Sequence, residues 1–302
     1  MIINETLRLS NGVNIPKLGL GTWLIEDSEA AETVRQAVKI GYRHFDTAEG
    51  YGNERGVGEG IRTCGMKRSE LFVTTKLQAF YKTYQEAKKA IEESLRTAGL
   101  DYFDLLLIHA PQPWTEFRGK NHYFEENREV WRAMEEAYEV GKLRAIGVAN
   151  FEKEDLDNLI DHARIKPMVN QILVHPSNTP KELIGYSQSR GILVEAYSPV
   201  AHGEALKNPA LAAMAKKYSV SIPALCIRYC LQLGLLPLPK SANPNHMADN
   251  ARVDFVISDE DMDTLVHLKT IHNYGKASCF PVYGGKMESD FTCKPGDFIE
   301  RK

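Results

Sequence analysis

The sequence predicts an α/β protein whose parallel strands close into a (β/α)8 barrel, the TIM-barrel architecture. Eight short β-prone runs alternate with amphipathic helical segments along most of the chain. Several runs are continuously apolar, as at residues 105–108, which is typical of parallel strands covered on both faces. An open, doubly wound sheet shows the same alternation and is the competing architecture. The predicted strands lie at residues 18–21, 43–46, 71–75, 104–108, 143–148, 167–171, 192–196 and 235–239.

The segments between these runs have the pattern of helices. Small or apolar residues at 87, 90, 91, 94, 95 and 98 repeat at intervals of three and four, which places them on one helix face. Ser28 precedes an acidic residue and predicts a helix N-cap. Gly41 and Gly99 follow helical segments at positions where a left-handed cap is favoured.

Two segments lie outside the alternation. Residues 5–15 predict two short strands around Asn11-Gly12, a strong hairpin signal, and this hairpin would plug the N-terminal end of a barrel. Residues 272–302 have no periodicity and predict an irregular C-terminal tail. Hairpin and tail account for much of the excess over the roughly 250 residues of a simple barrel. We therefore expect residues 1–302 to form one domain, with the hairpin in residues 1–16.

Composition narrows the functional classes. The chain has 302 residues, 37 Lys and Arg against 40 Asp and Glu, a net charge of −3, and 43% hydrophobic residues. This balance disfavours a nucleic-acid surface, which needs clustered basic residues, and no run of about 18 apolar residues predicts a membrane span. The N-terminus lacks the pattern of a secretory signal, and five cysteines, an odd number, disfavour a disulfide framework, so we expect a cytoplasmic protein. No Cys and His spacing predicts a metal site.

Polar side chains follow most of the predicted strands at their carboxyl ends, where barrel enzymes have their active sites. Each position also has an ordinary structural explanation, such as a capping Asp or a solvated Lys. Their coincidence at one face of the barrel nevertheless predicts a site. The residues are Asp46, Lys76, His109, Asn150, Gln171, Tyr197 and Lys240.

These residue types point to proton transfer to a carbonyl oxygen. Tyr51 lies five residues beyond Asp46, on the loop that leaves the same strand. A tyrosine has an ordinary pKa near 10, and a neighbouring ammonium lowers that pKa by stabilising the phenolate. We expect Lys76 to supply this charge and Asp46 to hold Lys76. His109 would orient the substrate oxygen, and Tyr51 is the predicted general acid.

At these residues the sequence resembles the aldo-keto reductase family, over nearly its whole length. The motifs are spread from residue 19 to residue 250 and follow the family order. They are Gly19-Leu20-Gly21-Thr22-Trp23, Asp46-Thr47-Ala48, Tyr51-Gly52-Asn53-Glu54, Thr75-Lys76, Leu100-Asp101-Tyr102, Leu107-Ile108-His109, Ile146-Gly147-Val148-Ala149-Asn150-Phe151, Val169-Asn170-Gln171, Ala196-Tyr197-Ser198-Pro199 and Pro239-Lys240-Ser241.

The resemblance implies a barrel that binds NADPH without a Rossmann fold and reduces aldehydes or ketones to alcohols. The glycines at 56, 58 and 60 have the wrong spacing for a dinucleotide-binding loop, in agreement with this. Hydride would come from the cofactor and the proton from Tyr51. The implied catalytic residues are Asp46, Tyr51, Lys76 and His109, and the implied substrate neighbours are Trp23, Tyr51, His109, Ala110 and Trp114. The implied cofactor contacts are Thr22, Asp46, Asn150, Gln171, Tyr197, Ser198, Pro199, Lys240, Ser241, Asn243, His246, Asp249 and Asn250.

Departures from the family pattern affect the cofactor and the substrate. Ala149 stands where many relatives have Ser, which removes one hydroxyl contact to the nicotinamide end. His246 stands where Arg is frequent, and a mostly neutral imidazole recognises a 2′-phosphate less well than a guanidinium. We therefore expect NADPH to be preferred, with appreciable NADH use. Ala110 and Gln78 stand where Trp is frequent, which opens the pocket to a bulkier or more polar carbonyl compound.

Three other functions compete with this interpretation. A Schiff-base aldolase would use Lys76 as its nucleophile, but it would not need Tyr51 or Tyr197. A cofactor-binding regulatory or sensor subunit could keep the same fold with little turnover, although the intact catalytic set argues against it. A metal-dependent hydrolase would need paired carboxylates or a His-x-His motif, which the strand ends do not offer.

Overall fold

In a computed structural model, described over residues 1–287, eight parallel strands form one sheet in the order β10-β9-β8-β7-β6-β5-β4-β3. A parallel bridge between Gly21 and Lys240 joins the two outermost strands, and the Gly19 N–H donates to the Pro237 carbonyl. The sheet is thus a barrel, which confirms the predicted fold and excludes the open sheet. The strands are β3 (Leu20–Gly21), β4 (His44–Asp46), β5 (Phe72–Leu77), β6 (Leu105–Ile108), β7 (Ile146–Ala149), β8 (Val169–Leu173), β9 (Leu193–Tyr197) and β10 (Leu236–Leu238).

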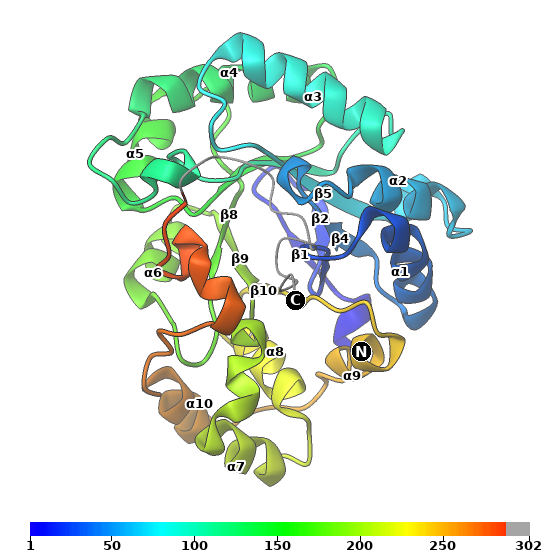
Figure 1. Cartoon of the computed structure of the whole chain (residues 1–302), viewed down its shortest axis with the longest axis vertical. Helices are drawn as coiled ribbons and strands as arrows, with labels where there is room; N and C mark the ends of the chain where they lie inside the picture. The colour runs from blue at the N-terminus through cyan, green and yellow to red at the C-terminus, as the bar shows by residue number, and fades with distance from the viewer. Residues whose placement is uncertain (288–302) are drawn as a thin grey trace, which may run out of the picture.

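Helices surround the barrel (Figure 1). The predicted apolar face of α3 is buried, and Thr83 caps that helix by accepting from the Glu86 N–H. The predicted cap at Ser28 is wrong, because α1 begins at Asp27 with Glu26 as its N-cap, and Ser28 lies inside the helix. The Asp27 carboxylate accepts from the Gly56 N–H at 2.7 Å. The helices are α1 (Asp27–Ile40), α2 (Glu54–Thr63), α3 (Tyr84–Ala98), α4 (Phe124–Glu139), α5 (Lys153–His162), α6 (Lys181–Ser189), α7 (Pro209–Lys217), α8 (Ile222–Gln232), α9 (Pro244–Asn250) and α10 (Asp259–Val266).

The glycines of α2 serve helix packing. A Cβ added to Gly58 would lie 1.9 Å from the carbonyl oxygen of Ala98 in α3, and one added to Gly56 would lie 2.2 Å from that of Asp27 in α1. Both distances are far below van der Waals contact. The glycines therefore let α2 approach its two neighbours closely, and they form a helix rather than a phosphate-binding loop.

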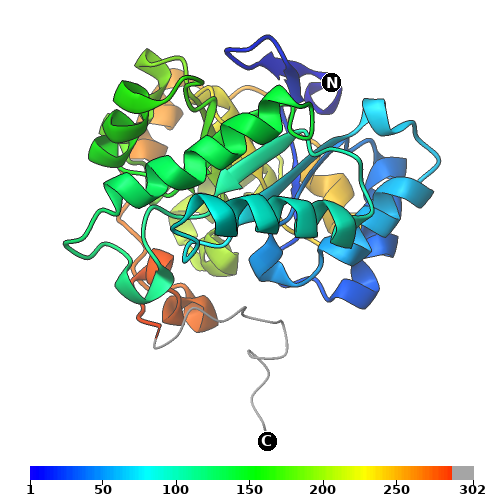
Figure 2. The same ribbon diagram turned by 90° about the horizontal axis from the view of Figure 1, so that it is seen from above.

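The N-terminal hairpin and the C-terminal segment lie at opposite ends of the barrel (Figure 2). Strands β1 (Thr6–Arg8) and β2 (Asn14–Pro16) pair antiparallel, as predicted, and Gly12 in their turn has φ of 89°. Asn11 Nδ2 donates to the Arg144 carbonyl ahead of β7 at 2.9 Å. The hairpin is thus attached at the N-terminal ends of the strands, which leaves the carboxyl ends to other segments.

The C-terminal segment is more ordered than the sequence predicts. Two short 3-10 helices, η6 (Gly275–Cys279) and η7 (Pro281–Tyr283), interrupt the expected irregular tail. Tyr274, Phe280 and Tyr283 are buried there, so aromatic packing explains the order. The rest of the predicted tail, residues 288–302, lies outside the described residues.

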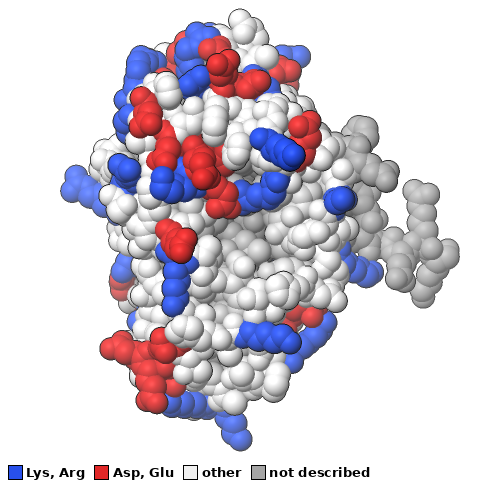
Figure 3. Space-filling model, turned by 90° about the vertical axis from the view of Figure 1, so that its left-hand side faces the viewer, with Lys and Arg blue, Asp and Glu red and all other residues white. Residues whose placement is uncertain are grey.

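Two further properties bear on partners. Within residues 1–287 no single helix is long and apolar enough to cross a membrane, and only α7 and α8, bent by 81° between them, pass such a test as a pair. On the face shown in Figure 3, acidic and basic side chains are interspersed. Ion pairs along helix surfaces, such as Lys153 with Asp157 at 2.6 Å on α5, place opposite charges side by side. This face therefore has no extended field of one charge sign.

Candidate active site

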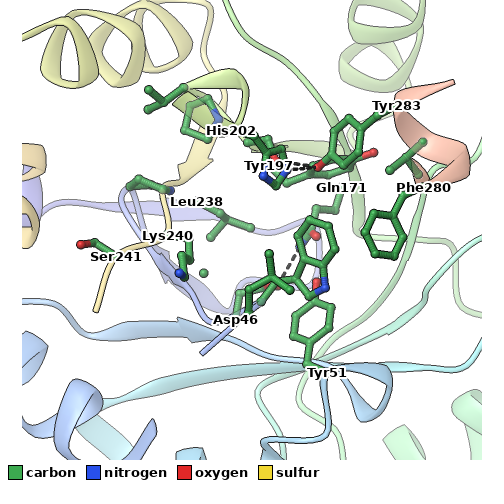
Figure 4. Close-up of a pocket in the computed structure, with 18 of the residues that line it drawn as sticks. Asp46, Tyr51, Gln171, Tyr197, His202, Leu238, Lys240, Ser241, Phe280 and Tyr283 are labelled. Atoms are coloured by element: carbon green, nitrogen blue, oxygen red, sulfur yellow. Dashed lines mark hydrogen bonds between the residues drawn. The ribbon is translucent and has the colours of Figure 1, made fainter. Parts of the chain in front are cut away.

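A cavity of about 680 Å³ lies at the carboxyl ends of the strands (Figure 4). Strands β4, β8 and β9, the loop after β10 and the C-terminal segment all contribute to its wall. Most of the residues singled out in the sequence meet here, although they come from segments far apart in the chain. They are Trp23, Asp46, Tyr51, His109, Trp114, Asn150, Gln171, Tyr197, Ser198, Pro199, Lys240, Ser241, His246, Asp249 and Asn250.

Four of the predicted residues do not line this cavity. Lys76 is fully buried beneath Tyr51, and Ala110 is buried as well. The Thr22 hydroxyl donates to the main-chain carbonyl of Asp46 at 2.9 Å. Asn243 caps α9, because its side-chain oxygen accepts from two backbone N–H groups of that helix. Thr22 and Asn243 are therefore committed to supporting the loops around the cavity.

Tyr51, Lys76 and Asp46 form a connected network. The Lys76 ammonium donates to Asp46 Oδ1 at 2.6 Å, to the Thr47 carbonyl at 2.9 Å and to the Tyr51 hydroxyl at 3.2 Å. These three acceptors use the three donors of an ammonium group. Asp46 ends β4 and Lys76 lies on the adjacent β5, where parallel pairing brings the two side chains together. Lys76 thereby fixes the phenolic oxygen of Tyr51 relative to Asp46.

The ionisation of Tyr51 differs from the expectation. Burial raises its pKa, while the Lys76 ammonium opposes that rise and the Asp46 charge adds to it. The net direction is upward because the side chain is enclosed, which sequence reasoning did not include. Burial alone would lower the pKa of Lys76, but Asp46 and Tyr51 reverse this and the pKa is raised. At neutral pH the site therefore holds a protonated phenol beside a charged ammonium.

His109 faces the same phenol. Its ring centroid lies 5.6 Å from that of Tyr51 at an interplanar angle of 70°, and 5.2 Å from Trp114. Burial, together with the Lys76 charge, holds the pKa of His109 well below its usual value. The imidazole is therefore neutral at physiological pH and can donate one N–H to a bound oxygen.

The amide side chains at the ends of β7 and β8 are partly committed. Gln171 Nε2 donates to Asp46 Oδ2 and to Glu195 Oε2, both at 2.8 Å. Asn150 Nδ2 donates to the His109 carbonyl at 2.9 Å, and Asn150 Oδ1 accepts from the Tyr197 hydroxyl at 2.7 Å. Within residues 1–287, the side-chain oxygen Oε1 of Gln171 and the second Nδ2 hydrogen of Asn150 have no hydrogen-bond partner, so both can bind a ligand.

The backbone beside these residues is strained. Asn150 has φ of 61° and Ser198 has φ of 50°, in the left-handed region that L-residues rarely adopt. Leu24, another residue of the cavity wall, has φ of 61°. Such strain gathers at functional sites, where the surrounding fold holds it in place.

The far end of the cavity suits a phosphorylated ligand. Figure 4 shows Lys240 and Ser241 on the opposite side of the cavity from Phe280. Burial lowers the pKa of Lys240, and His246 lies exposed at the rim. The cavity thus combines paired amides and a protonated phenol at one end with a cation at the other, so its residues fit a nicotinamide nucleotide. No group of three potential metal ligands occurs among the described residues.

Sequence reasoning missed three aromatic side chains of the cavity wall. His202, Phe280 and Tyr283 lie around Trp23, with ring centroids 5.2, 4.9 and 6.3 Å away. The Tyr283 hydroxyl makes hydrogen bonds with His202 Nε2 at 2.7 Å and with Ser198 Oγ at 2.8 Å. The aromatic residues of the tail were the available signal, but their spacing carries no recognisable code.

Comparison with known proteins identifies the family. The family model of the Aldo/keto reductase family matches residues 17–269. The chain belongs to the aldo/keto reductase family. It is 43% identical to glyoxal reductase of Bacillus subtilis over 265 residues, which are 87% of this chain and 92% of that protein. It is 37% identical to glycerol 2-dehydrogenase (NADP(+)) of Saccharomyces cerevisiae over 282 residues, 86% and 89% of the two chains.

Solved structures give the same result. An aldo/keto reductase from Brucella melitensis superposes with a TM-score of 0.81 at 37% identity, over 88% of this chain and 98% of that one. A Bombyx mori aldo-keto reductase in complex with NADP gives a TM-score of 0.80 at 34% identity, over 91% and 95% of the chains. This aldo/keto reductase is therefore an oxidoreductase of a family that uses nicotinamide cofactors on small carbonyl compounds.

Proposed function

We propose that this protein reduces aldehydes or ketones to alcohols with NADPH, and that Tyr51 donates the proton. The observation that carries the proposal is the hydrogen bond between the Lys76 ammonium and the Tyr51 hydroxyl, 3.2 Å long, at the wall of the cavity. We further propose that the whole chain is one domain and acts in the cytoplasm, which the free thiols of Cys64, Cys226, Cys230 and Cys279 support.

Proton transfer depends on the chain's own residues. The bound cofactor supplies the hydride. Tyr51 donates its proton to the carbonyl oxygen as negative charge develops there, and Lys76 stabilises the phenolate that remains. Asp46 keeps Lys76 charged and in place. Neutral His109 donates a hydrogen bond to the same oxygen, which orients the carbonyl toward the phenol.

The amide groups orient the cofactor. Gln171 Oε1 would accept from the carboxamide N–H of the nicotinamide, and Asn150 Nδ2 would donate to its carboxamide oxygen. The Tyr197 ring also lines the cavity and would offer a face for stacking on the nicotinamide. Ser198 and Pro199 continue this wall and would hold the pyrophosphate.

The adenosine end sets the cofactor preference. Lys240 supplies a charge for the 2′-phosphate, with Ser241 beside it. His246 is exposed at the rim, where it lacks the two-pronged phosphate contact that a guanidinium makes. The preference for NADPH is therefore moderate, and NADH also supports turnover. Asp249 and Asn250, which also line the cavity, would hold the adenine.

The substrate is a polar carbonyl compound. Gln78, His202 and Tyr283 add polar groups to the cavity wall, which also carries the indole rings of Trp23 and Trp114. Polar groups that are placed in an apolar pocket select substrates that bond with them. The names of two relatives, a glyoxal reductase and a glycerol dehydrogenase, also favour small polar substrates.

A substrate panel tests the proposal. Purified protein is mixed with NADPH or NADH and a series of aldehydes and ketones, and loss of the reduced cofactor is followed. We expect turnover with both cofactors and a kcat/KM ratio in favour of NADPH. A ratio above about 1000, roughly 4 kcal/mol, contradicts the moderate preference.

The same assay separates the competing functions. Cofactor binding without turnover on any carbonyl compound identifies a regulatory or sensor subunit. Borohydride trapping of a covalent adduct at Lys76 identifies an aldolase, which we do not expect, because Lys76 is charged and bonded to Asp46.

A further inference from the structure

A buried carboxyl group lies directly behind the catalytic network. Glu195 of β9 is fully buried, and its Oε2 accepts from Gln171 Nε2 at 2.8 Å. The same Nε2 donates to Asp46 Oδ2 at 2.8 Å, so one amide nitrogen bridges two carboxyl groups. Asp46 in turn accepts from Lys76, which bonds to Tyr51. A continuous chain of hydrogen bonds therefore leads from the phenol to Glu195.

The groups around Glu195 decide its charge. The charged or titratable groups near Glu195 are Asp46 and His44 of β4 and Lys76 of β5. Its neighbours on the adjacent strands are Gln171 of β8 and the apolar Leu236 of β10. Burial, and then the Asp46 charge, raises the pKa of Glu195 to about 8. His44 Nε2 lies 4.0 Å from Glu195 Oε1, but burial lowers the pKa of His44 to about 3, so it carries no compensating charge.

The hydrogen bonds place the proton of Glu195. Oε2 accepts from Gln171, and Oε1 has no hydrogen-bond partner within residues 1–287. A proton on Oε1 therefore disturbs no existing bond, whereas a proton on Oε2 would face the Gln171 N–H. At neutral pH the network then holds one negative charge, on Asp46, opposite one positive charge, on Lys76.

We propose that Glu195 is a positioning residue that sets the charge of the Asp46–Lys76–Tyr51 network and, through it, the acidity of the Tyr51 phenol. As a neutral acid, Glu195 holds Gln171 and leaves a single negative charge beside Lys76. As an anion, it adds a second negative charge and disfavours the Tyr51 phenolate. This inference rests on the proposed role of Tyr51 as proton donor.

The expected effect is a shift in pH dependence. Reduction needs the Tyr51 phenol and oxidation needs its phenolate, so both activities follow the pKa of Tyr51. That pKa is raised, so Glu195 is already ionised when Tyr51 titrates. Removing the charge of Glu195 lowers the pKa of Tyr51. We therefore expect the pH dependence of reduction and that of oxidation both to shift to lower pH by about one unit.

The test uses Glu195→Gln, which keeps the size and a hydrogen-bond acceptor for Gln171. Its matched control is Glu54→Gln. Glu54 is also a buried glutamate with a raised pKa, about 7, but it bonds to Thr75 at the outer side of β5, away from the phenol. The rates of reduction with NADPH and of oxidation with NADP+ are measured from about pH 5 to about pH 11.5, because the pKa of Tyr51 is raised above its ordinary value near 10.

Below about pH 7 we expect Glu195→Gln to retain kcat within about threefold of the unmodified enzyme, because both carry a neutral group at this position. At higher pH the fall of the reduction rate and the rise of the oxidation rate both occur at lower pH in Glu195→Gln, whereas in Glu54→Gln they occur at the same pH as in the unmodified enzyme. The inference is overturned if the pH–rate profiles of Glu195→Gln superpose on those of the unmodified enzyme, or if Glu54→Gln shows an equal shift. Tyr51→Phe is measured in parallel: wild-type turnover there contradicts the proposed function itself, whereas its loss with an unmoved Glu195→Gln profile contradicts only the role of Glu195.

A second measurement does not depend on how Glu195→Gln folds. The infrared band of a protonated carboxylic acid is followed against pH in Glu54→Gln protein with isotope-labelled glutamate. We expect a buried acid band at neutral pH that disappears with a midpoint near 8, the pKa of Glu195. Absence of this band at neutral pH overturns the inference.

Discussion

The buried carboxyl of Glu54 gives the stability of the protein a calculable pH dependence. Glu54 is 5% exposed, and its Oε1 accepts from the Thr75 hydroxyl at 2.5 Å. Burial raises its pKa from 4.5 to about 7, against the opposing effect of the hydrogen bonds from Thr75 and Ser94. Below pH 4.5 the Glu54 carboxyl is protonated in both the folded and the unfolded chain, so its titration does not lower the free energy of unfolding. Between 4.5 and about 7 only the folded chain keeps the proton, so its stability falls as pH rises.

The magnitude follows from the size of the shift. At about 1.4 kcal/mol for each pH unit, the rise from 4.5 to about 7 corresponds to roughly 3 kcal/mol. Glu54→Gln removes this titration. We therefore compare the free energy of unfolding of Glu54→Gln with that of the unmodified protein. We expect the difference, variant minus unmodified, to increase by about 3 kcal/mol as the pH rises from about 4.5 to about 8.

Urea unfolding of the two proteins at these two pH values measures the difference. Any constant effect of the amide cancels, because only the change with pH is compared. A difference between the two proteins that stays the same at both pH values, within about 0.5 kcal/mol, refutes the reasoning.

Three further predictions concern the cavity. His246→Arg adds a permanent charge at the adenosine end, and the NADPH-to-NADH ratio of kcat/KM should rise about tenfold; an unchanged ratio would contradict this placement of the 2′-phosphate. Gln78→Trp narrows the substrate side, so kcat/KM for bulky ketones should fall about tenfold relative to small aldehydes, and an equal effect on both would count against it. Tyr283→Phe removes the hydrogen bonds to Ser198 and His202, and limited proteolysis of the C-terminal segment should accelerate about tenfold; unchanged cleavage would show that these bonds do not hold the segment.

The strands were predictable because their signal is local. The apolar run at residues 105–108 and the polar residue that follows it can be read from the sequence, and the structure places that run in β6. The strand ends differ by up to three residues, as at β7, where Leu143 pairs with Phe103 only in an isolated bridge. The exact length of pairing depends on the neighbouring strand, which the local pattern does not contain.

Properties that arise from enclosure were not predictable. The pKa of Tyr51 is raised because burial outweighs the expected lowering by Lys76, and burial depends on how the whole cavity is enclosed. The contact of the tail with Ser198 and His202 likewise joins parts of the chain that no spacing relates. Glu195 did leave a signal that was overlooked, because a carboxyl in a strand covered on both faces must be buried.

The central claim is that Tyr51 is the proton donor, and Tyr51→Phe tests it most directly. The substitution keeps the ring and removes only the hydroxyl that bonds to Lys76. The dissociation constant for NADPH and the kcat for reduction of an aldehyde are measured on the same preparation. We predict cofactor binding within about threefold of the unmodified enzyme and a fall in kcat of at least about 100-fold. Turnover close to that of the unmodified enzyme would contradict the account.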